Sequence, residues 1–238
     1  MKHLPRAGVD VKKASQENLE HTMSTKKTAC VAQILALTVL FVGCGKSARD
    51  EIDFGTLNNS VYQNKFFGFS VTLPKDWSAQ DQKTQQRMMK KGLRLVTGND
   101  ENLKALVKAS ELQTVNLFAA FEHPVGSPVA YNPNINCVAE RVRELPGIKR
   151  GKDYLFQARM LLEGGQMHVS FPKEYYTEQL GGVTFDVMES EMSIVGKVIK
   201  QKYYATIRKG YALCFVVSFT NQDEQASLQR ILETATFN

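Results

Sequence analysis

The sequence has few of the residue patterns that build catalytic or metal sites. Of its four histidines and four cysteines, only His123, His168, Cys137 and Cys214 lie beyond Cys44. No two cysteines have the CxxC spacing of metal and redox sites, and no serine lies in the GxSxG turn of the α/β-hydrolase nucleophile. The sequence therefore predicts no enzyme, no metal site and no cofactor.

Phosphate and nucleic-acid binding are not indicated either. Gly164-Gly165 and Gly181-Gly182 flank turns, whereas a phosphate loop needs more glycines and a following helix. The formal net charge of the whole chain is +6, but residues 1–43 contain more basic than acidic residues, so the remainder is closer to neutral. Without a basic block or an aromatic-basic stripe in that remainder, no nucleic-acid partner is expected.

The chain has one apolar run, and it is short. It extends from Ala29 to Val42 behind Lys26-Lys27, whereas a spanning helix needs about 20 apolar residues. A basic start, a short apolar run and a small residue at its end are typical of an export signal. Residues 1–43 are therefore predicted to be a signal segment, whose true start is either Met1 or Met23.

The end of this run resembles the lipobox of bacterial lipoproteins. Phe41-Val42-Gly43-Cys44 matches it except at Phe41, where the family usually has Leu. The resemblance implies cleavage between Gly43 and Cys44 and acylation of Cys44, which would hold the protein to a membrane because two or more acyl chains anchor stably. An ordinary secretory signal and a retained short anchor are the alternatives. By the family's sorting rule, Gly45 favours the inner leaflet of the outer membrane in a diderm host.

The remaining chain is long enough for one domain with a substantial core. Residues 44–61 are polar and are predicted to be a tether, and residues 62–238 are predicted to fold. Within this part, Cys137 and Cys214 lie in apolar, strand-like surroundings. After export they form either a disulfide with each other or two buried free thiols.

The apolar pattern of residues 62–238 predicts an α+β domain with an antiparallel sheet, closed by an amphipathic helix. We expect a first strand in Tyr62–Trp77, with Phe67, Phe69, Val71 and Leu73 on its buried face. Further strands are expected over 114–122, 135–139, 184–195, 197–208 and 211–220, of which the last three are long. Helices are expected over 79–95, 101–109 and 152–162, and a final helix from Asp223.

Two segments resemble PsbP-like domains. Phe66-Phe67-Gly68-Phe69-Ser70-Val71-Thr72-Leu73-Pro74-Lys75-Asp76-Trp77 is similar to their entry strand, and Gly210–Phe219 with Thr236-Phe237 is similar to their final strand and close. The resemblance implies a PsbP-like α/β/α sandwich, a central antiparallel sheet flanked by helices, over residues 62–238. Because members of this family serve mainly as binding modules, it implies binding rather than catalysis. The segment 79–109 matches the family poorly.

Each of the remaining candidate residues is explained either by a binding role or by an ordinary structural role. Neighbours on a strand point to opposite faces, so Glu122 and His123 cannot bind one metal ion, and His168 is explained as a strand side chain. Asp186, Glu189 and Glu191 offer oxygens for calcium, or they form a solvated outer face. Tyrosine pairs at 175–176 and 203–204 form either a recognition surface or an alternation of core and surface rings.

Two functions follow from these observations. The first is a membrane-anchored envelope lipoprotein whose domain is a non-enzymatic binding module for an envelope protein. The alternative is a small-ligand receptor or an enzyme that uses a pocket between the sheet and the 79–109 helical insertion.

Overall fold

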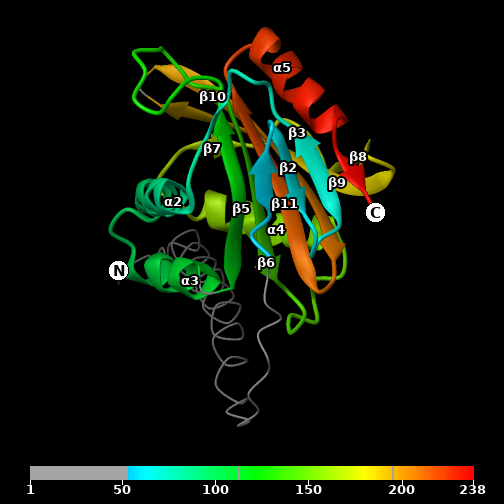
Figure 1. Ribbon diagram of the computed structural model, residues 1–238. Coiled ribbons are helices and arrows are strands. Elements are labelled where there is room, and N and C mark those ends of the chain that lie inside the picture. The colour runs from blue at the N-terminus through cyan, green and yellow to red at the C-terminus, as the bar shows by residue number, and fades with distance from the viewer. Residues whose placement is uncertain (1–52, 112, 195) are drawn as a thin grey trace, which may run out of the picture. The chain divides into compact units, whose positions relative to one another are not determined.

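A large antiparallel sheet forms the centre of the domain (Figure 1). The computed structural model describes residues 53–111, 113–194 and 196–238. The strand order is β4-β5-β6-β11-β10-β9-β7, and β8 pairs with β9 as well. The strands are β4 (Ser78–Ala79), β5 (Thr114–Phe121), β6 (Asn134–Arg141), β7 (Val169–Ser170), β8 (Tyr176–Leu180), β9 (Val183–Ile194), β10 (Lys197–Arg208) and β11 (Tyr211–Phe219).

The second sheet is small and is built from the two ends of the domain. Its order is β1-β2-β3-β12, with β1 (Thr56–Asn58), β2 (Val61–Asn64), β3 (Phe69–Thr72) and β12 (Thr236–Phe237). The single strand predicted in Tyr62–Trp77 is therefore a hairpin, whose turn contains Gly68 at a positive φ of 65°. The predicted tether also ends earlier than residue 61, because β1 pairs with β2.

Four helices are described, and their positions agree with the predicted ones to within a few residues. They are α2 (Gln82–Thr97), α3 (Glu101–Glu111), α4 (Gly151–Glu163) and α5 (Gln222–Glu233). Gly98 ends α2 with a positive φ of 50°. The last helix is capped by Asn221 rather than started by Asp223, because the Asn221 side chain accepts the backbone N–H of Glu224. Within the described ranges, no helix is long and apolar enough to cross a bilayer.

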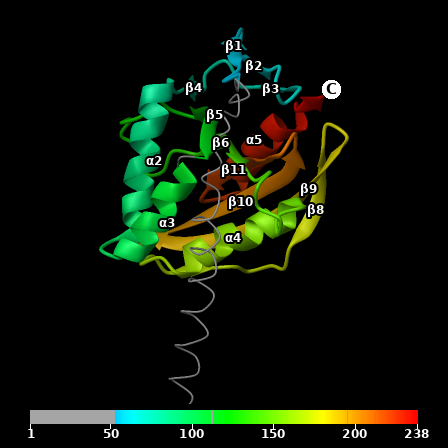
Figure 2. The same ribbon diagram turned by 90° about the horizontal axis from the view of Figure 1, so that it is seen from below.

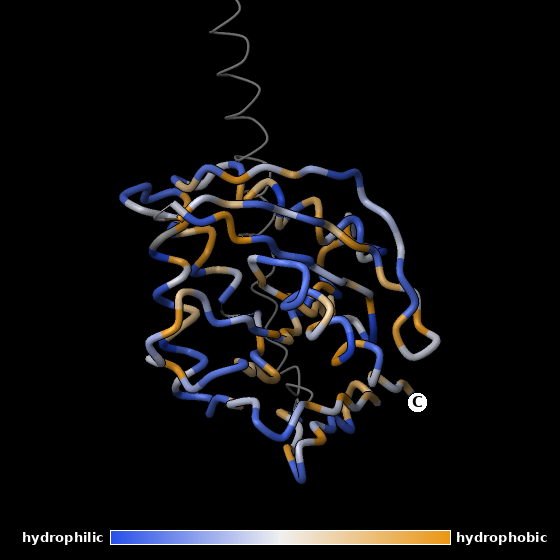
Figure 3. Tube along the Cα trace, turned by 90° about the horizontal axis from the view of Figure 1, so that it is seen from above, coloured by the Kyte–Doolittle hydropathy of each residue, from blue (hydrophilic) through white to orange (hydrophobic). Residues whose placement is uncertain are grey.

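The larger core fills the space between the two sheets and beneath α5. Strand β11 is buried along almost its whole length, because residues on one of its faces enter this core while Cys214 and Val216 on the other face pack in a smaller core. Aromatic rings pack densely here; those of Tyr62 and Phe118 have centroids 4.6 Å apart. Figure 3 shows hydrophobic and hydrophilic residues interchanging along the trace, the pattern of strands with differently covered faces.

The opposite face of the large sheet carries a smaller core beneath α4 (Figure 2). Leu155 of α4, Met188, Ala205 and Cys214 are its buried members. The helix approaches the sheet closely at Gly151, where a Cβ atom would lie 1.9 Å from the carbonyl oxygen of Ala205. The predicted α+β class with a central antiparallel sheet is thus confirmed. One face of this sheet is covered by α5 together with the small second sheet.

Cys137 and Cys214 are both buried free thiols. They lie on neighbouring strands, but Cys137 pairs with Phe215 and Cys214 pairs with Val138. Paired residues share a face and consecutive residues alternate, so the two thiols point to opposite sides of the sheet. Cys137 belongs to the larger core and Cys214 to the smaller one. Of the two alternatives, the disulfide is therefore wrong.

Candidate functional site

A pocket opens where an edge of each sheet is left unpaired. Strand β1 is an edge of the small sheet and β4 an edge of the large one. Between them, a pocket of about 200 Å³ reaches down to the larger core. We call it the β1–β4 pocket; it is lined by Phe54, Gly55, Leu57, Tyr62, Ala79, Gln80, Asp81, Gln82, Gln85, Leu117, Phe118 and Ala119. A pocket does lie beside the 79–109 insertion, as predicted, at the start of α2.

The start of α2 positions the polar side of this pocket. Asp81 caps the helix by accepting the backbone N–H of Thr84 at 2.7 Å. That hydrogen bond lowers the pKa of Asp81, so its carboxylate is charged at neutral pH. The helix is tied to the large sheet by Gln82, whose Nε2 donates to the carbonyl oxygen of Asn116 at 3.0 Å. One turn further on, Gln85 is therefore held against β5.

Gln85 borders the β1–β4 pocket, and its side chain is almost completely buried. The residue is 7% exposed, and its Nε2 donates to the carbonyl oxygen of Gln80 at 2.8 Å. This bond sets the orientation of the amide, since a carbonyl oxygen only accepts. The Oε1 atom then has no hydrogen-bond partner among the residues that the structure describes, and it is also buried from solvent. A buried acceptor without a partner costs about 1–3 kcal/mol.

The opposite wall of the pocket is apolar and includes Leu57 of β1 and the preceding Phe54, which together we call the apolar lip. Phe54 is 52% exposed and Leu57 is 42% exposed. The lip is held by Tyr62, whose hydroxyl donates to the carbonyl oxygen of Phe54 at 2.8 Å. Burial raises the pKa of Tyr62, so this hydroxyl stays protonated and keeps donating. The pocket therefore has an apolar wall opposite the polar start of α2.

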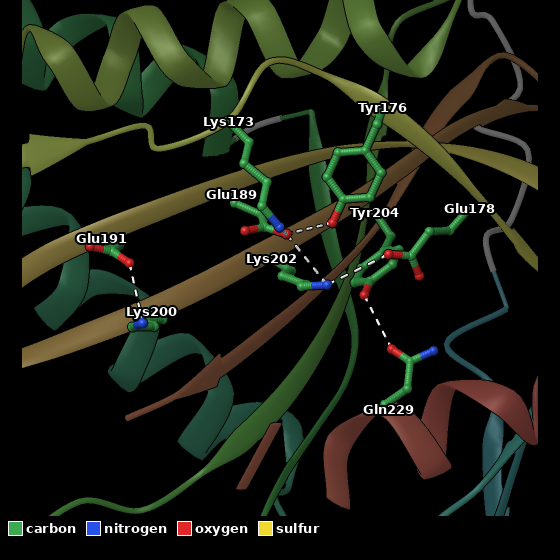
Figure 4. Close-up of polar contacts among 9 residues, drawn as sticks. All are labelled: Lys173, Tyr176, Glu178, Glu189, Glu191, Lys200, Lys202, Tyr204 and Gln229. Carbon is green, nitrogen blue, oxygen red and sulfur yellow. Dashed lines mark hydrogen bonds and ion pairs between the residues drawn. The ribbon is translucent and has the colours of Figure 1, made fainter. Parts of the chain in front are cut away.

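A second polar region lies on the face of the large sheet beside α5 (Figure 4). We call it the ionic ladder; it consists of Lys173, Tyr176, Glu178, Glu189, Glu191, Lys200, Lys202, Tyr204 and Gln229. Lys202 lies 3.4 Å from Glu189 directly across the strand pair and 3.5 Å from Glu178. Lys200 and Glu191 form the next cross-strand pair at 3.4 Å.

Glu189 is the best-bonded carboxylate of the ionic ladder. It accepts from the Tyr176 hydroxyl at 2.6 Å and from Lys173 Nζ at 3.1 Å. Burial acts to raise its pKa, but these hydrogen bonds and the charge of Lys202 outweigh burial and lower it. Burial also raises the pKa of Tyr204, and the nearby Glu178 and Glu189 raise it further. Every charge of the ladder has a partner of opposite sign.

The calcium alternative for this strand is not supported by the arrangement of its acids. Glu189 and Glu191 share a face as expected, but each one is paired with lysine. Asp186 lies on the opposite face, where it accepts the backbone N–H of Lys152 at 2.9 Å. Among residues 53–111, 113–194 and 196–238, no three His, Cys, Asp or Glu side chains gather as a metal site would require. The other explanation, a solvated outer face, describes Glu189 and Glu191 only in part, because both residues form ion pairs with lysine on that face.

Neither His123 nor His168 lies within a strand, and one tyrosine pair alternates between the two cores. Glu122 and His123 follow the end of β5 in a bend, not in a strand as expected, and His168 directly precedes β7. Tyr203 packs in the smaller core and Tyr204 in the larger one, so this pair shows the predicted alternation between faces.

Glu140 is a further carboxyl group near the smaller core. It accepts from the Ser110 hydroxyl at 2.8 Å, and burial raises its pKa. The thiol of Cys214 has a pKa raised to about 12 by burial and by Glu140, so it is not a nucleophile at neutral pH.

Gly43 and Cys44, the predicted cleavage and acylation positions, lie outside the described residues. Sequence reasoning did not single out Gln85, nor did it name Phe54, Leu57 and Asp81 of the pocket or Lys202 of the ladder. Glutamine is common on exposed helix faces, so nothing in its local sequence indicates that its amide is buried. The sequence indicated only the segment, because a pocket was expected between the sheet and residues 79–109.

No family model matches this chain, and no curated protein sequence does. Among solved structures, it is similar to the cyanobacterial PsbP protein CyanoP from Synechocystis sp. PCC 6803, with a TM-score of 0.45 and 12% identity over 83% of this chain and 99% of that one. It is also similar to LpqN, which is involved in cell envelope biogenesis of Mycobacterium tuberculosis, with a TM-score of 0.41 and 13% identity over 71% of this chain and 83% of that one. At these values no residue role passes from either protein to this chain.

Proposed function

We propose that this chain is a lipid-anchored protein of the bacterial cell envelope whose domain binds an envelope protein and catalyses no reaction. The anchor is supported by the apolar run and by Gly43-Cys44 at its end. In a diderm host, Gly45 favours the inner leaflet of the outer membrane. The absence of a catalytic role is supported by the sequence, which lacks a nucleophile motif and a metal-ligand pattern.

The anchor is tested by metabolic labelling with a tagged fatty acid. Wild-type chain should incorporate the label, whereas Cys44→Ser should not, because the variant lacks the thiol that is acylated. Cys30→Ser is the matched control, since it alters a cysteine within the predicted signal. Label that remains on Cys44→Ser would refute lipidation at this residue.

The observation that carries the binding role is the apolar lip next to a free strand edge. Leu57 of β1 and the preceding Phe54 are exposed, and within the described residues β1 pairs on one side only. An extended segment of another protein can add to such an edge and place apolar side chains against the lip. The chain from Cys44 to Phe54 spans at most roughly 35 Å when fully extended. An anchored domain would therefore keep this edge close to the membrane, where envelope proteins are encountered.

A photo-crosslinking residue at Leu57 tests this role in living cells. We expect one defined envelope protein to be captured from position 57. Val198 is the matched control, because it is 46% exposed on the distant strand β10. Equal capture from both positions, or none from position 57, would contradict binding at this edge.

The second candidate function is a small-ligand receptor. The specific observation in its favour is the β1–β4 pocket itself, whose apolar wall lies opposite the polar start of α2. Ligand pockets usually combine apolar walls with a few polar groups that fix orientation, although most are larger than this one. Retention of a specific compound by the purified chain, detected by mass spectrometry after denaturation, would support this candidate.

A further inference from the structure

We propose that one end of the domain docks onto the anionic headgroups of the bilayer that holds the anchor. We call this surface the basic end; it consists of the exposed residues Leu145, Lys149, Arg150, Lys152 and Phe156. The inference rests on the anchor of the proposed function and adds a second, weaker contact with the membrane. The composition of the surface, the pairing of its acids and the exit of the tether support it.

The basic end combines positive charge with exposed apolar side chains. Lys149 and Arg150 lie just before α4, and Lys152 lies in its first turn. Leu145 is 46% exposed in the preceding loop. Phe156 is 52% exposed and follows Lys152 by four residues, so both side chains lie in one row of the helix. Basic residues are attracted to anionic headgroups, and apolar side chains beside them enter the membrane interface.

The acidic residues beside the basic end are engaged within the domain. Glu144 forms an ion pair with Arg141 at 2.6 Å. Asp153 accepts the backbone N–H groups of Lys149 at 3.1 Å and of Arg150 at 2.9 Å. The segment 145–156 contains three basic residues and one acidic residue, so its charge stays positive.

The turn between β10 and β11 adds a further cation to this end. Lys209 is exposed in that turn. The backbone N–H of Val142 donates to the carbonyl oxygen of Gly210 at 3.0 Å, which places the turn beside the loop that leads to α4. Because the fold brings Lys209 to the other basic residues, no continuous basic block indicates this surface in the sequence.

The tether leaves the domain at the same end. Asp53, the first described residue, accepts the backbone N–H of Lys65 at 3.2 Å. The next residue, Phe66, has its ring centroid 5.3 Å from Lys209 Nζ. Figure 1 shows the loop between β6 and α4 at this lower end of the domain. The chain from Cys44 to Asp53 spans at most roughly 32 Å, so an anchored domain holds its basic end near the headgroups.

This proximity favours a bilayer over an acidic protein as the occupant. At physiological salt, charges are screened beyond about 8 Å. Each basic residue within that distance of an anionic surface strengthens binding about fivefold. So few basic residues bind weakly from solution, but an anchor supplies the bilayer at a high local concentration. An acidic protein would first have to be recruited.

A fluorescent probe at position 145 tests the docking. Leu145→Cys is introduced into the whole protein with Cys30→Ser, and Cys137 and Cys214 resist labelling because both are buried. The labelled protein is reconstituted into phosphatidylcholine vesicles that carry a lipid-attached quencher, with or without about 30 mol% phosphatidylglycerol. In about 0.1 M salt, quenching should be at least about threefold stronger with the anionic lipid, and about 1 M salt should remove the difference.

A probe at the opposite end of the domain is the positional control. Val198 is 46% exposed near the start of β10, whereas Lys209 follows the end of that strand. The two residues are therefore roughly 35 Å apart. A probe on Val198→Cys should be quenched equally on neutral and anionic vesicles.

Two double variants test the charges. Lys149→Gln with Lys152→Gln should lower the ratio of docked to undocked protein about 25-fold, fivefold for each lysine. Lys90→Gln with Lys91→Gln is the matched control, because it removes two exposed lysines from α2. It should leave the ratio unchanged within about twofold, since these lysines are not part of the basic end. Thermal unfolding of each variant shows whether it is folded.

Flotation with the neutral vesicles separates this proposal from the anchor. A protein that floats but is quenched equally on both vesicle types keeps its anchor and loses the docking. A protein that does not float with neutral vesicles, but is quenched at position 145 on anionic ones, keeps the docking and loses the anchor. Quenching that persists in the folded Lys149 and Lys152 variant, or that is equal at positions 145 and 198, would overturn the proposal. A photo-crosslinker at position 145 that captures a protein instead of lipid would do so as well.

Discussion

The ionic ladder and the β1–β4 pocket are both polar regions beside the larger core, but they differ in how their polar groups are satisfied. In the ladder, the side chains of Lys202 and Glu189 are only 13% and 14% exposed, and each one has partners in the chain. Beside the pocket, the Gln85 oxygen is buried and has no partner among the described residues. A region that satisfies its own polar groups stabilises the fold, whereas a buried acceptor without a partner lowers the stability of the fold.

The difference follows from geometry. Direct cross-strand pairing in an antiparallel sheet brings Lys202 to Glu189 and Lys200 to Glu191, so the strand register alone completes the ladder. The pocket lies between the edges of two sheets, where no strand continues the pattern. Its polar groups therefore depend on the start of α2, which satisfies the Gln85 amide nitrogen but not the oxygen.

The largest effect is expected when the ladder loses its central cation. Lys202→Met leaves Glu178 and Glu189 facing each other in a half-buried site. We expect the free energy of unfolding to fall by about 2 kcal/mol, measured by chemical denaturation at neutral pH. Lys200→Met is the matched control, because Lys200 is 46% exposed and its pair should be worth less than about 1 kcal/mol. Equal losses in the two variants would show that the more buried ion pair of Lys202 does not stabilise the fold more than the exposed pair of Lys200.

A smaller effect is expected from the pH dependence of Glu189. Its pKa is lowered in the folded chain from an ordinary value of 4.5, so its contribution to stability is fully present above about pH 4.5 and is lost as the pH falls through the lower folded value. Glu189→Gln should flatten the acid limb of a stability–pH profile measured by thermal unfolding. Glu191→Gln, which alters the more exposed rung, should leave that limb nearly unchanged. An acid limb identical to wild type in Glu189→Gln would contradict this assignment.

The smallest effect is expected in the pocket itself. Gln85→Met loses one hydrogen bond to Gln80 but also removes the buried unpaired oxygen. Because these contributions oppose each other, the free energy of unfolding should change by less than about 1 kcal/mol. Denaturation of the free chain measures this change. A loss as large as that of Lys202→Met would mean that the Gln85 amide stabilises the fold as much as the ladder does.

Many of the secondary-structure elements could be predicted from the sequence, because their signals are local. The apolar pattern over 197–208 and 211–220 predicted β10 and β11, and Lys209 and Gly210 between them have the positive φ that a tight hairpin turn needs. The pattern over 79–95 likewise predicted α2 to within a few residues. The hairpin of β2 and β3 was missed, because alternation continues from Phe67 into the strand although Phe67 lies in the turn.

The sequence by itself determined the α+β class, the helices, the hairpin of the long strands and the signal-like segment that ends at Cys44, since each depends on residues close together in the chain. Only the tertiary structure decided that Cys137 and Cys214 point to opposite faces, that Glu189 is paired with Lys202, and that the oxygen of Gln85 is buried without a partner among the described residues. Strand register and the meeting of two sheet edges join residues far apart in sequence, so no local pattern carries that information.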